Sequence, residues 1–120
     1  MRQHLLLALF LFPLLAAGCV RSTAPSPAAS QGSVIVYRDG VFEPRELRVA
    51  AGATVTFKNE GTRPVWPASG IHPTHLICPG FNALRSLGAG ETYQFTFTEK
   101  KICPFHNHLS ATENGRIIVE

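Results

Sequence analysis

The chain has 120 residues, 45% of them hydrophobic and 16% charged, with a formal net charge of +3 at pH 7. This length allows one modest domain with a single core. The basic residues form no run and do not alternate with aromatic ones, so we expect no nucleic acid as a partner.

The first 18 residues have the layout of a secretory signal peptide. A basic start precedes an apolar run from Leu5 to Ala17, which is too short to span a membrane as a mature helix. The five residues that end at Cys19 resemble a bacterial lipobox, in which the cysteine is lipid-modified and becomes the first mature residue. We therefore expect 1–18 to be removed and Cys19 to anchor the protein in the cell envelope. Because no acidic residue follows Cys19, the outer membrane is favoured if the cell has two membranes. A plain secretory signal is the alternative.

Residues 19–32 are rich in Ser, Ala and Pro and contain one charge. Such a composition cannot bury a core and predicts a flexible linker. The folded part is therefore expected at 33–120 as one domain.

Within 33–120, short stretches of β-branched and aromatic residues alternate with turn residues, as is typical of strands. We expect strands at 33–38, 47–50, 54–59, 92–98, 102–105 and 116–119. No window predicts an amphipathic helix, although 80–87 has room for one helical turn. Short strands without crossover helices favour an all-β fold, an antiparallel β-sandwich or barrel. The aromatic residues Phe57, Phe95 and Phe97 are expected in its core.

Four of the five histidines lie in two short clusters. His72 and His75 form a His-x-x-His pair, while His106 and His108 follow Cys103 in the last part of the chain. Imidazole and thiolate are side chains that hold copper or zinc, and a site made from two separated segments needs a folded scaffold between them. These five residues are our candidate metal ligands.

Several short motifs, in this order, resemble the cupredoxin family. They are Phe-Glu-Pro at 42–44, Val-Thr-Phe-Lys-Asn at 55–59, Gly-Glu at 90–91, Phe-Thr-Phe at 95–97, the terminal Cys/His cluster and Gly-Arg-Ile-Ile-Val at 115–119. The resemblance covers nearly the whole domain. It implies a Greek-key β-sandwich with copper at one end, ligated by His75, Cys103 and His106. It also implies electron transfer with a redox partner protein in a periplasm or on a cell surface.

Two features depart from the blue-copper pattern of that family. The only methionine is Met1, so a backbone carbonyl, Glu113 or a second histidine would have to replace the usual axial methionine. The additional His72 and His108 resemble a plastocyanin-like subgroup of bacterial secreted proteins with His-x-x-His and His-x-His pairs. The alternative function is therefore copper acquisition, buffering or delivery through histidines, and zinc fits the same ligands. A small copper enzyme is the third hypothesis, with the least support because no motif for hydrolytic or phosphoryl chemistry is present.

Cys103 has two alternative roles. If His75 and His106 face each other across neighbouring antiparallel strands, the same register places Cys78 opposite Cys103. In an oxidising compartment these cysteines would form a disulfide. Otherwise Cys103 is a copper thiolate and Cys78 a buried or spare thiol, or both cysteines are reduced and structural. The two roles exclude each other because a disulfide sulfur is not a thiolate ligand.

Overall fold

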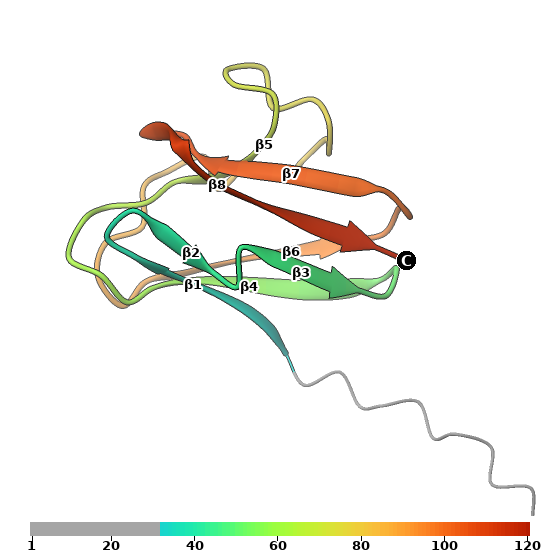
Figure 1. The fold of residues 1–120 in the computed structure, drawn as a ribbon, viewed down its shortest axis with the longest axis horizontal. Helices are drawn as coiled ribbons and strands as arrows, with labels where there is room; N and C mark the ends of the chain where they lie inside the picture. Colours follow the sequence, from blue (N-terminus) through green and yellow to red (C-terminus); the bar gives the residue numbers. More distant parts are fainter. Residues whose placement is uncertain (1–31) are drawn as a thin grey trace, which may run out of the picture.

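The computed structural model describes residues 32–120, which form two β-sheets packed face to face (Figure 1). One sheet has the strand order β2-β1-β4-β6 and the other β3-β8-β7-β5. The strands are β1 (Ser33–Arg38), β2 (Val41–Glu43), β3 (Glu46–Val49), β4 (Ala53–Asn59), β5 (Pro67–Ser69), β6 (Thr92–Phe97), β7 (Ile102–Asn107) and β8 (Ser110–Val119). In this part of the chain we find no helix with the length and apolarity needed to cross a membrane. The predicted signal peptide, the lipidation of Cys19 and almost all of the predicted linker lie outside the described residues.

The predicted all-β sandwich is confirmed, and most of the predicted strands are present. The last strand begins already at Ser110, well before the expected position 116. The strands β2 and β5 are not predicted from the sequence, because each has only three residues and shows no alternation over several positions. Residues 80–87 contain no helical turn: Asn82 and Leu87 form isolated bridges to Ala68 and Val65, and the chain bends between them at 84–85.

The expectation of purely antiparallel pairing is wrong at two places. β1 runs parallel to β4, and β3 runs parallel to β8, while the other pairs of neighbouring strands are antiparallel. The expectation rested on the absence of helices that could connect parallel strands. Here the chain passes from β1 to β4 through β3, which belongs to the opposite sheet. A strand of the other layer thus replaces the crossover helix.

Aromatic rings fill the space between the two sheets. Phe57, Phe81 and Phe105 are each at most 1% exposed, and the rings of Phe57 and Phe105 meet edge to face at a centroid distance of 5.3 Å. Phe97 is buried as expected, and Phe95 is partly buried against the same cluster. Close edge-to-face packing stabilises a core beyond the area it buries. It gives β4 and β7 a rigid support.

The segment 70–80 rises from β5 at the end of the sandwich away from Ser33, where β1 begins (Figure 1). β5 pairs with the last residues of β7, so that Ala68 lies opposite His106 and Pro67 opposite Asn107. The segment between β5 and β6 therefore starts beside the end of β7. This arrangement brings the two histidine motifs to one end of the molecule.

Candidate metal centre

Four histidines from two distant segments meet at this end of the sandwich. His72 and His75 lie in segment 70–80, His106 lies in β7 and His108 follows that strand. Each contributes one ring nitrogen, and these four atoms all lie within 4.8 Å of one another. Cys103, the fifth candidate ligand, is not part of this histidine cluster.

The four rings form two close pairs. His72 Nδ1 lies 3.2 Å from His106 Nε2, and His75 Nε2 lies 3.0 Å from His108 Nδ1. Nitrogens bound to one metal ion at about 2 Å stand about 3 to 4 Å from each other, so this spacing is close to that of a ligand set. Four imidazoles suit copper and zinc. The residues present therefore fit such an ion without a large rearrangement.

The four histidines differ in their exposure to solvent. His106 is only 5% exposed, His75 and His108 are half-buried, and His72 is exposed. An ion held here would be reachable from the side of His72. His106 would be its buried support.

Asn107 fixes the bend that presents the two terminal histidines. Its side chain is buried, and its Oδ1 accepts hydrogen bonds from the backbone N–H groups of Trp66 at 2.9 Å and Leu109 at 3.1 Å. The pairing between β7 and β8 shifts register between His106 and Asn107, as in a β-bulge. This irregularity and the turn that follows bring His106 and His108 into one cluster, while the Asn107 side chain bonds to Trp66 and Leu109.

Glu113 supports this bend through its hydrogen bond with Asn107. Its side chain is 11% exposed and accepts hydrogen bonds from Asn107 Nδ2 and the Tyr37 hydroxyl, both at 2.8 Å. It also forms an ion pair with Arg63 at 2.9 Å. Burial alone would raise the pKa of Glu113, but these hydrogen bonds and the Arg63 charge lower it on balance. These three groups engage the carboxylate, and Glu113 does not belong to the group of four histidines.

Trp66 and Asn82 contact the rings of His108 and His75 and are hydrogen-bonded to each other. The Trp66 ring packs on the His108 ring at a centroid distance of 4.6 Å, and its indole N–H donates to Asn82 Oδ1 at 2.7 Å. The amide nitrogen of Asn82 lies 2.9 Å from His75 Nδ1. Sequence reasoning misses Asn82, because no motif marks it and only the folded segment between β5 and β6 brings it to His75.

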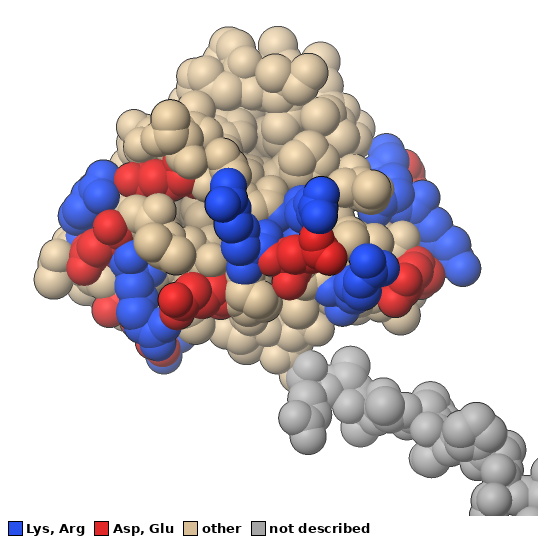
Figure 2. Space-filling model, in the orientation of Figure 1, with Lys and Arg blue, Asp and Glu red and all other residues tan. Residues whose placement is uncertain are grey.

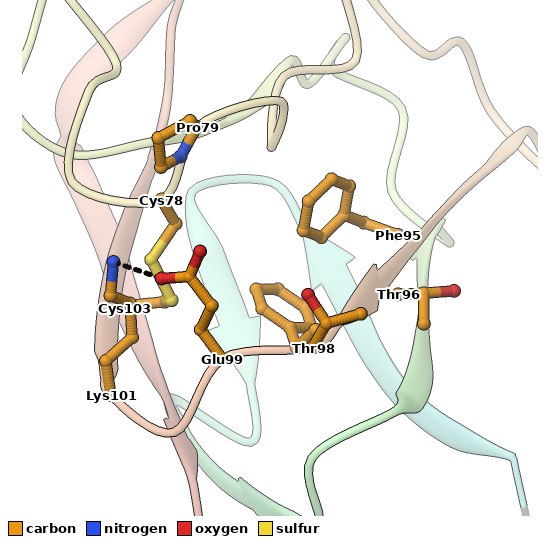
Figure 3. Close-up of a pocket in the computed structure, with 9 residues that line it drawn as sticks. Cys78, Pro79, Phe95, Thr96, Thr98, Glu99, Lys101 and Cys103 are labelled. Atoms are coloured by element: carbon orange, nitrogen blue, oxygen red, sulfur yellow. Dashed lines mark ion pairs between the residues drawn. A yellow bond between two sulfur atoms is a disulfide. The ribbon is translucent and has the colours of Figure 1, made fainter.

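In the structure Cys103 is joined to Cys78 by a disulfide with a Cα–Cα distance of 5.8 Å. Both cysteines are buried, and Figure 3 shows them lining a pocket beside Phe95 and the ion pair between Glu99 and Lys101. A bonded sulfur offers no thiolate to copper. The Cys103 thiolate expected from the blue-copper pattern is therefore absent from this structure.

The register that suggested this pairing is wrong. Ala68, and not His75, lies opposite His106, and neither His75 nor Cys78 belongs to a strand. Cys78 reaches β7 because segment 70–80 folds back, with its own backbone N–H donating to Ser69 Oγ at 2.8 Å. The contact depends on the shape of a loop, which strand periodicity does not describe.

The end that carries the histidine cluster has no charged side chains nearby in sequence. Residues 64–84 and 102–112 contain no Lys, Arg, Asp or Glu, and Figure 2 shows the charges gathered below an uncharged upper end. Five large apolar side chains are exposed in these segments: Ile71, Leu76, Leu84, Ile102 and Leu109. Because the ligands are neutral, a bound ion would keep its full positive charge.

Burial lowers the pKa of His106 to about 4, assisted by repulsion from the other three histidines. Burial, with repulsion from His108 and His72, also lowers the pKa of His75. A histidine that resists protonation when folded binds more protons when unfolded, where its pKa is about 6.5. Its contribution to stability is therefore complete above about pH 6.5 and is lost as the pH falls toward 4.

We accordingly predict that the metal-free protein loses roughly 1 to 2 kcal/mol of unfolding free energy between pH 7 and pH 4.5 through His106. Urea unfolding at several pH values, with wild type and His106→Gln compared, measures this contribution. The variant should show the smaller loss, because glutamine does not titrate. Equal losses in the two proteins would contradict the assignment to His106.

Searches among known proteins agree with this architecture. The purple cupredoxin of Nitrosopumilus maritimus has a TM-score of 0.65 at 21% identity, with 73% of this chain and 99% of that one covered. An oxidised amicyanin variant has a TM-score of 0.64 at 21% identity, with 78% and 87% covered. These likenesses define the fold as that of a cupredoxin.

A sequence relative defines the family more closely. Plastocyanin A/B of Petroselinum crispum is 34% identical over 87 residues, which cover 66% of this chain and 87% of the plastocyanin. No family model matches the chain. The chain belongs to the plastocyanin-like cupredoxin family.

Proposed function

We propose that this protein binds a single copper ion through His72, His75, His106 and His108. The convergence of four ring nitrogens within 4.8 Å carries this proposal. Family membership supports copper as the ion, and for the same nitrogen ligands copper also binds more tightly than zinc. Bound copper would supply a one-electron change between its two common oxidation states.

Copper acquisition, buffering or delivery is the role that the geometry favours. The disulfide between Cys78 and Cys103 occupies the thiolate of a blue-copper site, which leaves an all-imidazole ligand set. His72 is exposed, so ligands of a delivery partner can approach the ion from that side. A site that is open on one side suits transfer of its ion.

Electron transfer to a redox partner protein is the second candidate, and the relationship to plastocyanin favours it. The buried aromatic cluster next to β7 would limit movement of His106 when the charge of the ion changes. Small movement of ligands is a requirement of rapid electron exchange. The two roles differ in whether a thiolate joins the ion.

We further propose that the protein works in the cell envelope, with a lipid on Cys19 and residues 19–32 as a linker. The first described strand begins at Ser33, on the side of the molecule away from segment 70–80, which carries His72 and His75 (Figure 1). An anchor connected there would leave the cluster facing away from the membrane. A partner in the same compartment could then reach it.

Titration of the protein with Cu(II) without reductant, followed by visible absorption and metal analysis, tests these roles. We expect one copper per chain with weak bands only, because imidazole gives no intense charge-transfer band of the thiolate kind. An intense band would make Cys103 a ligand and favour electron transfer. Absence of stoichiometric binding would contradict both roles, and preferential retention of zinc would contradict copper as the ion.

A further inference from the structure

The side-chain amide of Asn82 has an orientation that its neighbours determine. Its Oδ1 accepts hydrogen bonds from the indole N–H of Trp66 at 2.7 Å and from the backbone N–H of Leu84 at 2.9 Å. Both groups can only donate, so this end of the amide must be the oxygen. Its Nδ2, which can only donate, therefore faces His75 Nδ1 at 2.9 Å.

This contact decides which nitrogen of His75 carries the proton. A ring nitrogen that faces an amide N–H must offer its lone pair, so the neutral His75 has its proton on Nε2. Nε2 lies 3.0 Å from His108 Nδ1 and donates that proton to it. In the neutral His75, the proton is therefore on Nε2, the nitrogen that faces the other histidines.

A histidine nitrogen must lose its proton before it binds a metal ion. If His75 used Nε2, the proton would have to move to Nδ1, where it would meet the N–H groups of Asn82, and two donors would face each other. Rotation of the Asn82 amide does not remove this conflict, because Nδ2 would then face the N–H groups of Trp66 and Leu84. Histidine ligands in proteins usually have an acceptor at this place, such as a carboxylate or a carbonyl oxygen.

We propose that Asn82 is a positioning residue that holds His75 back as the last and weakest ligand of the copper site proposed above. In the described structure the rings of His72, His106 and His108 form hydrogen bonds only with other histidine rings and face no amide donor of this kind, so these three take the ion first. His75 joins only when its contact with the Asn82 amide is given up. Asn82 thereby lowers the affinity of the site for copper.

The substitution Asn82→Asp tests this role by reversing the polarity of one contact. A carboxylate keeps acceptors for Trp66 and Leu84 and adds an acceptor for a proton on His75 Nδ1. We expect copper affinity, measured by competition with a chelator, to rise by about 10- to 100-fold. Leu84→Asp is the matched control for charge, because Leu84 is exposed and its positive φ of 59° is tolerated by aspartate. That variant should show only a small rise.

The background variant His75→Ala shows whether the gain passes through His75. In a double-mutant cycle, Asn82→Asp should then raise copper affinity no more than Leu84→Asp does. An equal gain with and without His75, or no gain in a folded Asn82→Asp protein, would overturn the role of Asn82.

Nitrogen NMR of the metal-free wild-type protein determines which nitrogen of His75 carries the proton, without copper. We expect His75 to carry its proton on Nε2 in wild type and on Nδ1 in Asn82→Asp. A proton on Nδ1 in wild type would overturn the proposal, whatever the affinities. If wild type binds no copper, the proposed function fails, while the position of this proton still decides whether Asn82 restrains His75.

Discussion

Replacing His106 by glutamine is expected to lower the affinity for copper by at least about 100-fold, the largest effect of any substitution in the histidine cluster. His106 is the only buried member, so water cannot easily take its place. His72 is exposed, and a water molecule can fill the position that its ring leaves. His72→Gln should therefore cost only about 10-fold. Competition with a chelator of known affinity measures both.

Thr74→Ser serves as the control for these substitutions, because Thr74 is exposed between the two loop histidines and its hydroxyl bonds only within the segment. Its copper affinity should equal that of wild type. A loss in His72→Gln as large as that in His106→Gln would show that burial does not set the order. Full affinity in both variants would place the ion outside the cluster.

Removal of the disulfide is expected to have the largest effect on stability. The bond closes a loop of 25 residues, and loss of that closure corresponds to about 3 to 4 kcal/mol of unfolding free energy. We predict this loss for the double variant Cys78→Ala/Cys103→Ala in denaturant unfolding. The copper affinity should fall too, because Cys78 ties the segment with His72 and His75 to the strand with His106. Reduction of the wild-type disulfide should have the same two effects.

The single variant Cys78→Ala tests whether Cys103 binds copper once its thiol is free. It frees the Cys103 thiol and leaves the four histidine residues unsubstituted. Cys103 and His106 are three positions apart on β7 and so point to opposite faces of the strand. We therefore expect no intense thiolate band when copper is added. Such a band, or wild-type stability of the double variant, would contradict the structural role assigned to the bond.

At the candidate site, the sequence predicts the histidines but not the residues that position them. The residue types are visible as two His motifs, and their compactness is enough to suggest that they act together. Their spacing does not tell that Asn107 bends the chain after β7, nor that Asn82 faces His75. Asn107 acts partly through a hydrogen bond to Trp66, 41 positions away, and Asn82 reaches His75, seven positions away, only through the irregular fold of the segment between them. Such contacts leave no periodic signal.

The sequence by itself determined the class of fold, because alternation of apolar and polar residues is a local property that survives in any arrangement of the strands. It also singled out the four histidines as candidate ligands, since histidine pairs at short spacing lie close together in any fold. Only the tertiary structure decided the parallel pairs β1 with β4 and β3 with β8, the disulfide of Cys103, and the proton position on His75. Each of these depends on which distant segments come into contact. Those contacts are fixed by the packing of the whole core and by loop shape, and neither is encoded in the pattern of a single segment.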